Sequence, residues 1–399
     1  MSGALSGLRI LDLSSVLMGP FATQLMADMG ADVIKIESPA GDTVRGIGPM
    51  RHPQMGSNFL HVNRNKRSLV LDLKNPAGLQ AFFQLVSTAD VVVYNIRPQA
   101  MRRLGIDYER LKALNPRIIY AGLYGYSEKG PYAGKPAYDD LIQGVAAVPS
   151  LMSQASGGEP RYVPLTLADR TVGLMASNAI LAAVIARHQT GMEQAVEVPM
   201  FETLTQYVLG EHMAGASYLP PLGPTGYARL LVQERRPYPT TDGYLCVLIY
   251  TDRHWAAFLD LIGQGVLFTQ DPRFANIGAR SQLINDLYAM VAQALQTDTT
   301  EAWMARLNQA DIPCMPMHDV DSLLQDPHLW AVGMLQRVEH PTEGAMLEIG
   351  VPVSFSDTPA STQQQPAPAL GQHSVQVLRE AGLTPEAIEA LQACGATNR

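Results

Sequence analysis

One acidic residue stands between a strand-like run and a long apolar run. The stretch PLTLADRTVG, residues 164–173, places Asp169 at the start of the apolar run 169–191. An aspartate at a helix N-cap accepts hydrogen bonds from the first-turn amides, which is one interpretation of this position. A partly buried carboxylate in an irregular turn can instead act as a nucleophile toward an acyl group. The residue pattern alone does not separate the two interpretations.

Two basic clusters next to strand-like runs suggest an anion site. In an acidic protein, such clusters fit a phosphate-bearing ligand, or equally a solvated face that balances nearby acids. The first cluster accompanies the run 68–73 and has a single acid, Asp72, beside it. The second directly follows the run 90–95. The clusters consist of Arg64, Lys66, Arg67 and Lys74, and of Arg97, Arg102 and Arg103.

Other kinds of chemistry find little support in the motifs. The first turn, LSSVLMGPFATQ, holds only Gly19 of a dinucleotide fingerprint, so we expect neither nicotinamide nor flavin. The nine histidines form no HxxxH or HExxH pair, and we expect no metal. Cys246, Cys314 and Cys394 form no CxxC pair, which fits buried thiols in a reducing cytoplasm.

Composition narrows the class of protein. The 399 residues are 47% hydrophobic and 17% charged, which is sufficient for packed cores. The net charge of −8 argues against general nucleic-acid binding. The start MSGALSGLRI lacks the features of a signal peptide, and no apolar run reaches the roughly 18 residues of a membrane span. We therefore expect a cytoplasmic protein that binds no membrane.

The first half alternates short apolar strands with helices. We expect strands at 8–14, 31–37, 68–73, 90–95, 117–125 and 195–198, and helices at 19–30, 75–89, 169–191 and 199–215. Asn75 and Pro76 mark a helix start. The helix 169–191 is apolar nearly all round, which predicts deep burial. This alternation predicts an α/β fold with a doubly wound parallel sheet.

The composition changes after residue 215. Residues 216–243 are rich in proline and glycine and predict a long connection. A second unit at 244–325 begins with a strand and continues with helices near 252–263, 281–296 and 299–309. The return segment 326–399 holds strand-like runs at 334–354, a low-complexity linker at 357–371 and two terminal helices. The predicted organisation is thus 1–215, 216–243, 244–325 and 326–399.

Six segments in order resemble one enzyme family between about residues 5 and 385. They include LSGLRILDLSSVLMGPFATQLMADMGADVIKIESPAGDTVRG, NRNKRSLVLDLKNPAG, LADRTVGLMASNAILAAVIARHQTG and PALGQHSVQVLREAG. The resemblance is to the class III CoA-transferases of CaiB/BaiF type, which include formyl-CoA and crotonobetainyl-CoA:carnitine transferases. It implies a large Rossmann-like domain built from the N-terminal half and the C-terminal tail, with a smaller α/β domain. It also implies a homodimer interlocked like chain links, which would explain the connection 216–243.

The resemblance assigns roles to individual residues. Asp169 would be the nucleophile that forms an acyl anhydride and then an aspartyl-CoA thioester. The substrates would be an acyl-CoA and a small carboxylic acid, with CoA as the carried group. At Leu17 some relatives carry a glutamine, and at Ser38 an arginine, so the acyl and nucleotide contacts differ here. The CoA contacts would be Leu17, Met18, Ser38, Leu71, Asp72, Leu73, Lys74, Asn95, Ile96, Arg97, Arg103, Tyr138 and Asp139.

Two alternatives accompany this assignment. Relatives that racemise α-methylacyl-CoA use a histidine base where this chain has Tyr138, followed by Asp139. A phenol, with a pKa near about 10, is a poor base at neutral pH, which favours CoA transfer. A non-catalytic CoA-binding protein would have lost the acid in LADRTVG, which is intact.

The identities of the acids are less constrained. The region LIYTDRHWAAF has no glycine run like the lid of formyl-CoA transferases. This weakens an oxalate or formate assignment and leaves dicarboxylate, hydroxy-acid and carnitine-like acceptors open. Arg170 and Arg253 are candidates to bind a second carboxylate.

Overall fold

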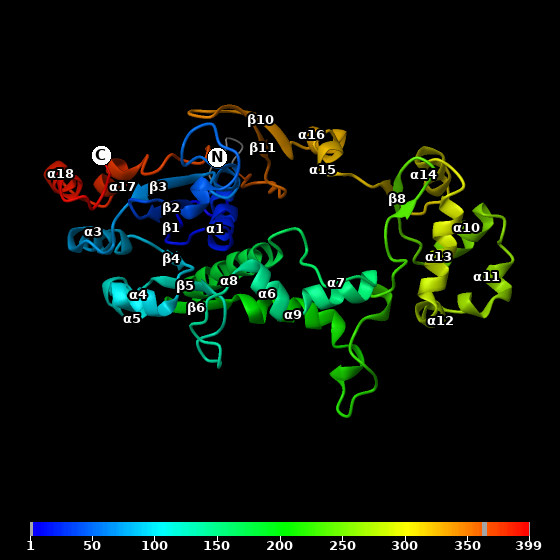
Figure 1. Cartoon of the computed structure of the whole chain (residues 1–399). Coiled ribbons are helices and arrows are strands. Elements are labelled where there is room, and N and C mark those ends of the chain that lie inside the picture. The colour runs from blue at the N-terminus through cyan, green and yellow to red at the C-terminus, as the bar shows by residue number, and fades with distance from the viewer. Residues whose placement is uncertain (1–2, 361–364, 399) are drawn as a thin grey trace. The chain divides into compact units, whose positions relative to one another are not determined.

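The computed structural model describes residues 3–360 and 365–398, which form two compact units (Figure 1). The first unit comprises the described residues of Met1–Ala146, Pro164–Gln206 and Pro327–Arg399. The second comprises Ala147–Val163 and Tyr207–Asp326, a wider range than the predicted 244–325. The connection joins this unit because its Tyr238 pairs with Leu245 in a small sheet.

The first unit is built on a six-stranded sheet with the order β3-β2-β1-β4-β5-β6. All neighbouring strands are parallel, which confirms the doubly wound α/β prediction. The order reverses between β1 and β4, because the chain moves outward in one direction and then in the other. The strands are β1 (Arg9–Asp12), β2 (Asp32–Glu37), β3 (Lys66–Val70), β4 (Val91–Tyr94), β5 (Ile119–Tyr124) and β6 (Gln194–Pro199).

Helices cover both faces of this sheet. On one face α1 (Met18–Asp28) and α8 (Leu167–Thr190) pack against each other and against the strands. The other face carries a core from α3 (Pro76–Val86), α5 (Tyr108–Leu114), α17 (Ser374–Glu380) and α18 (Pro385–Ala393). As predicted, Asn75 caps α3: its side chain accepts a hydrogen bond from the amide of Ala77.

The C-terminal tail belongs to the large unit. The amide of His373 donates to the Ser68 carbonyl at 2.9 Å, and the Thr397 hydroxyl donates to the Val70 carbonyl at 2.6 Å. The remaining elements of this unit include α2 (Ser57–Leu60), α4 (Pro98–Leu104), α6 (Asp139–Val145), α16 (Pro327–Ala331) and the hairpin of β10 (Leu335–His340) and β11 (Gly344–Ile349). Helix α9 (Met200–His212) begins in it and ends in the second unit.

The second unit combines a three-stranded sheet with a helical core. Its helices near 252, 284 and 300 agree with the sequence prediction. Trp255, Phe258 and Trp303 are buried in its core. Its elements are α7 (Val148–Ser156), β7 (Tyr238–Pro239), β8 (Tyr244–Val247), α10 (Asp252–Leu261), α11 (Leu267–Gln270), α12 (Ile277–Gln282), α13 (Ile284–Leu295), α14 (Thr300–Gln309), β9 (Cys314–Pro316) and α15 (Val320–Leu323).

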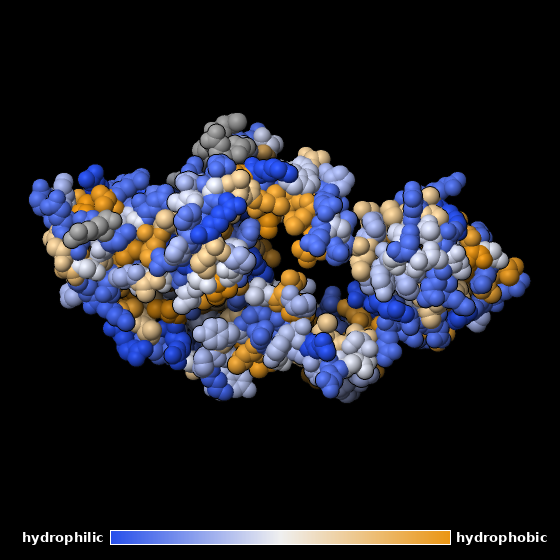
Figure 2. Space-filling model, turned by 45° about the horizontal axis from the view of Figure 1, so that its top comes forward, coloured by the Kyte–Doolittle hydropathy of each residue, from blue (hydrophilic) through white to orange (hydrophobic). Residues whose placement is uncertain are grey.

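Helix α8 departs from two predictions. It is not buried all round, because Leu174 and Ile185 are 52% and 58% exposed. It is also the one helix of the described residues that is long and apolar enough to cross a membrane, contrary to the expectation that no such run exists. In the first unit it packs on α1, β5 and β6, which accounts for its apolar inner face. Figure 2 shows apolar residues reaching the surface in scattered groups.

Candidate active site

The candidate site lies where the strand order reverses. In a doubly wound sheet, the loops beyond the carboxyl ends of the two diverging strands open a crevice for ligands. Here the loops after β1 and β4 border a cavity of about 430 Å³. Asp169, near the start of α8, lines the same cavity.

The structure gathers most of the predicted site residues in this cavity. Besides Asp169, these residues come from three segments of the chain. One segment follows β1, another follows β4, and the third precedes α6. Asp139 lies next to them and is 8% exposed. The predicted residues in the lining are Leu17, Met18, Asn95, Ile96, Arg97, Arg103 and Tyr138.

Ser38 and the segment from Leu71 to Lys74 lie outside the cavity lining. They follow β2 and β3 on the carboxyl side of the sheet, where Ser38 and Lys74 are exposed. The Leu71 side chain is buried in the core, and its amide donates to the Glu37 carbonyl at 2.8 Å. The amide of Asp72 donates to the Ala396 carbonyl at 2.8 Å. The C-terminal tail therefore already occupies one of the backbone donors in this segment.

In the loop between β5 and α6, only Tyr138 at its end was predicted from the sequence. Tyr124, Glu128 and Lys135 line the cavity, together with Met200 at the start of α9. The segment GYSEKGPY carries neither a nucleophile motif nor a phosphate-binding motif, so none of its residues was expected in the site. Its place after a parallel strand was the available signal, because such loops share the edge of the sheet with the site.

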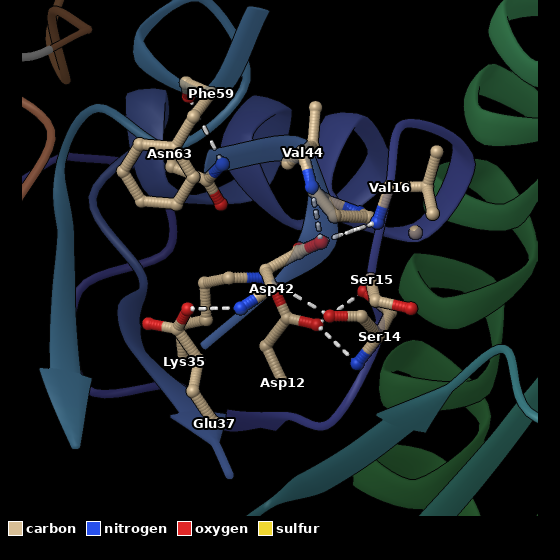
Figure 3. A network of polar contacts seen from close by, with 12 residues as sticks. Asp12, Ser14, Ser15, Val16, Lys35, Glu37, Asp42, Val44, Phe59 and Asn63 are labelled. Carbon is tan, nitrogen blue, oxygen red and sulfur yellow. Dashed lines mark hydrogen bonds and ion pairs between the residues drawn. The ribbon is translucent and has the colours of Figure 1, made fainter. Parts of the chain in front are cut away.

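The loop after β1 is held by a buried polar network (Figure 3). The Asp42 carboxylate accepts the Val16 amide at 3.1 Å and forms an ion pair with Lys35 at 2.8 Å. Val16 has a φ of 67°, a left-handed conformation that costs energy for a β-branched residue. The network sustains this strain, and the resulting turn directs Leu17 and Met18 into the cavity lining.

Asn95 joins the loops after β1 and β4. Its side-chain oxygen accepts the Ser15 amide at 2.9 Å, and its side-chain amide donates to the Ser15 carbonyl at 2.7 Å. A paired contact of this kind fixes both loops without using a charge. Asn95 thus positions the rim of the cavity, and it also lines it.

Most of the first basic cluster is structural rather than free to bind an anion. Arg64 pairs with Asp28 at 2.6 Å, Lys66 with Asp12 at 3.0 Å, and Arg67 with Asp32 at 2.7 Å. Each partner acid lies far away in the sequence, so the cluster looked unbalanced when it was read locally. In the second cluster, Arg102 contacts Glu128 at 3.5 Å, while Arg97 and Arg103 line the cavity without a salt bridge to any described residue.

Asp169 is the third residue of α8 and not its N-cap. The helix begins at Leu167, with Thr166 at the N-cap position, so the cap interpretation is wrong. The Asp169 amide donates to the Asp139 carboxylate at 2.9 Å. Within the described ranges, its own carboxylate forms neither a hydrogen bond nor a salt bridge. A half-buried carboxylate without a partner is available for chemistry.

The surroundings of Asp169 weaken its acidity. Burial, and then the nearby Asp139 carboxylate, raise the pKa of Asp169 to about 7, against the opposing charge of Arg170. A position in the first turn of a helix favours the ionised form of a carboxylate, but desolvation has the larger effect here. A pKa near the working pH is typical of a group that takes part in a reaction.

The start of α1 presents backbone donors beside the cavity. This helix has no side-chain cap, and its N-cap residue Leu17 and first residue Met18 line the cavity. The first amides of a helix have no partner within the helix and attract negative charge. In α8, by contrast, the amides of Leu167 and Asp169 are bonded to Leu165 and Asp139. The start of α1 is therefore a better place than the start of α8 to stabilise an oxyanion.

The remaining residues considered from the sequence are Tyr138, Arg253 and possible metal ligands. Tyr138 is 74% exposed, at the N-terminal end of α6. Arg253 belongs to the second unit, where it pairs with Asp311 at 2.9 Å. No group of three or more potential metal ligands occurs in the part of the chain that the structure describes.

The chain is similar to known proteins along most of its length. The sequence profile of CoA-transferase family III matches residues 5–374. An acyl-CoA transferase of Fusarium pseudograminearum is 35% identical, over 97% of this chain and 86% of the relative. The succinate–glutarate CoA-transferase of Agrobacterium fabrum is 33% identical, over 94% of this chain and 95% of the relative. A solved CaiB/BaiF family protein from Brucella suis matches with a TM-score of 0.80 at 29% identity, covering 96% of this chain and 100% of that one.

Proposed function

The chain belongs to CoA-transferase family III, and we propose that it exchanges CoA between carboxylic acids by covalent catalysis at Asp169. The observation that carries this proposal is the Asp169 carboxylate, which faces the cavity and has no bonding partner among the described residues. Two relatives support transfer between carboxylic acids: one is named an acyl-CoA transferase, and the other a succinate–glutarate CoA-transferase.

The proposed reaction has four balanced steps. Asp169 attacks the thioester carbonyl, the C–S bond breaks, and a mixed anhydride and CoA thiolate form. The thiolate then attacks the Asp169 acyl carbon, giving an aspartyl-CoA thioester and releasing the donor acid. The acceptor carboxylate attacks this thioester, which forms a second anhydride and frees the thiolate again. Finally the thiolate attacks the acceptor acyl group, and the Asp169 carboxylate is restored.

The chain supplies what these steps require. Each step exchanges one activated acyl bond for another, so only water must be kept away from the anhydrides. The amides at the start of α1 would stabilise the oxyanions that form at the carbonyl carbons. Arg97, Arg103 and Lys135 in the lining carry the charge needed to bind the phosphates of CoA. Ser38 and Leu71–Lys74, at the ends of the neighbouring strands, would take the part of CoA that extends beyond the cavity.

The cavity gives less support to the alternative of α-methylacyl-CoA racemisation. That reaction needs a second base opposite the carboxylate, and Tyr138 occupies the position where racemases carry a histidine. No histidine occurs among the described residues that line the cavity. Incubation of a 2-methylacyl-CoA in deuterated water therefore provides a test. Exchange of the α-hydrogen with inversion would overturn the assignment as a transferase.

We also propose that the chain works as a homodimer. Leu174, Ile185 and Tyr207 on α8 and α9 are each more than half exposed, at 52%, 58% and 65%. Exposed apolar side chains such as these favour burial against another surface. A second copy of the chain is the partner that the family resemblance implies. Light scattering coupled to size-exclusion chromatography would give twice the mass of the 43.3 kDa chain.

Trapping the intermediate tests the role of Asp169 directly. Incubation with an acyl-CoA followed by hydroxylamine should convert Asp169 to its hydroxamate, detectable by peptide mass spectrometry. The matched control is Asp140→Ala, which removes an exposed acid two residues from Tyr138. It should leave both turnover and labelling unchanged. Labelling of another acid, with Asp169 unmodified, would refute the proposal.

A further inference from the structure

Arg170 is positioned next to the reactive carboxylate by the packing of α8 on α1. Gly173 permits this close packing, because a Cβ there would come within 2.9 Å of both the Met18 carbonyl oxygen and the Phe21 ring. Phe21 is one helical turn after Leu17, so the two share a face of α1. Leu17 and Asp169 line the cavity, while Phe21 and Arg170 contact each other on the same two helices outside the cavity lining.

The guanidinium of Arg170 is held in a defined plane. Its central carbon lies 4.5 Å from the centroid of the Phe21 ring. Stacking on an aromatic face holds the guanidinium plane and leaves the in-plane N–H groups free to bind a carboxylate through two hydrogen bonds. No carboxylate of the described residues lies within salt-bridge distance of Arg170, although it is half-buried. The donors of this arginine are therefore available to a ligand.

His61 adds a second polar group to the same place. It follows α2, and its carbonyl accepts a hydrogen bond from Gln24 of α1 at 3.2 Å. Gln24 is three residues after Phe21, on the same side of that helix. Burial, and then the charges of Arg64 and Arg170, lower the pKa of the His61 imidazole. The imidazole itself has no hydrogen-bond partner in the described part of the chain.

We propose that Arg170 and His61 form a subsite for the distal carboxylate of a dicarboxylic acid. This inference rests on the proposed function, because the other carboxylate of the same acid reacts at Asp169. A half-buried pair of nitrogen donors without a counter-ion favours an anion, and planar two-point binding favours a carboxylate. The acids expected here are short aliphatic dicarboxylates, whose two carboxylates would reach Asp169 and Arg170. Arg253 has no part in the subsite, because it already pairs with Asp311 in the second unit.

A different role for Arg170 would produce a different kinetic result. The charge of Arg170 lowers the pKa of Asp169, in opposition to burial and to Asp139. If that were its only role, its loss would slow transfer to every acid by the same factor. A distal subsite predicts selective loss, with dicarboxylates affected and monocarboxylates spared.

The test compares acceptors of matched length in one assay. Full-length enzyme would transfer CoA from butyryl-CoA to succinate, glutarate, valerate and hexanoate, with kcat and KM measured for each acceptor. Arg170→Gln should lower kcat/KM for the two dicarboxylates by about 10- to 100-fold, mostly through KM, as expected for lost charge-assisted hydrogen bonds. The monocarboxylates should change by less than about threefold. His61→Gln, on a different element, should reduce dicarboxylate transfer by a smaller factor in the same direction.

A matched control separates the subsite from general effects of losing an arginine. Arg110 is exposed on α5 and stacks on Phe83 at 5.2 Å, away from the cavity. Arg110→Gln should leave all four acceptors unchanged. Equal losses for both acid classes in Arg170→Gln would overturn the subsite, as would a wild-type enzyme that prefers valerate to succinate. If the wild-type enzyme transferred CoA to no acid at all, the proposed function itself would fail.

Discussion

Asp12 and Asp169 are two carboxylates of the same unit whose surroundings shift their pKa values in opposite directions. Asp12, at the end of β1, is fully buried, and burial alone would raise its pKa. The ammonium groups of Lys66 and Lys35, with hydrogen bonds from Ser14 and Thr23, instead hold the pKa of Asp12 at about 2. Asp169 is less buried, yet its pKa is raised to about 7.

The difference lies in the partners and not in the degree of burial. Lys66 contacts Asp12 at 3.0 Å, and the Thr23 hydroxyl donates to it at 2.6 Å, so its oxygens are engaged. Asp169 has an acid, Asp139, as its close neighbour, and no donor of the described residues reaches its oxygens. A carboxylate whose hydrogen bonds are satisfied supports the fold, whereas one without partners retains its reactivity.

The largest expected effect follows from removing the reactive carboxylate. Asp169→Ala should reduce CoA transfer by about 10³-fold or more, because covalent catalysis has no substitute nucleophile at this position. The measurement is the steady-state rate of CoA exchange between an acyl-CoA and an acid.

The same variant should remain folded and bind CoA. Its circular dichroism spectrum and its CoA titration should match those of the wild-type enzyme. Activity within tenfold of wild type would show that Asp169 is not the nucleophile. Asp12 and Asp169 could then no longer be contrasted as a structural and a catalytic carboxylate.

The second prediction concerns Asp12, where the loss should appear in stability. Asp12→Asn leaves the Lys66 ammonium buried without its counter-ion, which should cost about 3–5 kcal/mol of unfolding free energy. Urea denaturation measures this cost. Asp32→Asn is the control, because Asp32 pairs with Arg9 and Arg67 near the surface and its loss should cost about 1 kcal/mol or less. Equal costs for the two variants would mean that burial does not govern the contribution of these ion pairs.

The sequence predicted the sheet well and the polar core poorly. Short apolar runs after turn residues are local signals, and all six predicted strands of the large unit are present. The pairing of Arg64 with Asp28 and of Lys66 with Asp12 joins residues far apart in the chain, so no local pattern shows it. Two basic residues that suggested an anion site are in fact neutralised in the core.

The site could be predicted only in part, for related reasons. The turn after β1 and the basic run after β4 were found because they follow strands, and the family resemblance singled out Asp169. Apart from Tyr138, the loop between β5 and α6 carried no signal, and its contribution to the cavity depends on the fold of the sheet. The exposed side of α8 could not be foreseen either, because an exposed apolar face has the same composition as a buried one.

The third prediction tests the acid neighbour of Asp169. Activity should rise with pH as Asp169 ionises, with the midpoint of kcat/KM near its pKa of about 7. Asp139→Asn removes a negative charge but keeps an oxygen to accept the Asp169 amide. The pKa of Asp169 should therefore fall, and the midpoint should move about one pH unit toward acid. A midpoint that stayed in place would show that the Asp139 charge does not act on Asp169.

The smallest effect is on stability, and its sign distinguishes the two carboxylates. The folded-state pKa of Asp169 is raised from 3.8 to about 7, so its ionisation opposes folding. Wild-type stability should consequently decline as pH rises from about 4 to about 7, and it regains nothing above that range. Asp169→Asn removes this cost and should be more stable than wild type at pH 8, by about 1 kcal/mol after solvent screening.

Asp12 should show the reverse dependence. Its depressed pKa means that the contribution of Asp12 to stability is present above about pH 4 and is lost as pH falls through about 2.

The stability effect of Asp169 is measured by urea titration of wild type and Asp169→Asn between pH 4 and 8. The unfolding free energies of the two proteins should converge at the acid end and diverge at the alkaline end. An asparagine variant less stable than wild type at pH 8 would mean that the Asp169 carboxylate has a stabilising partner. In that case Asp169 would be a structural acid of the same kind as Asp12.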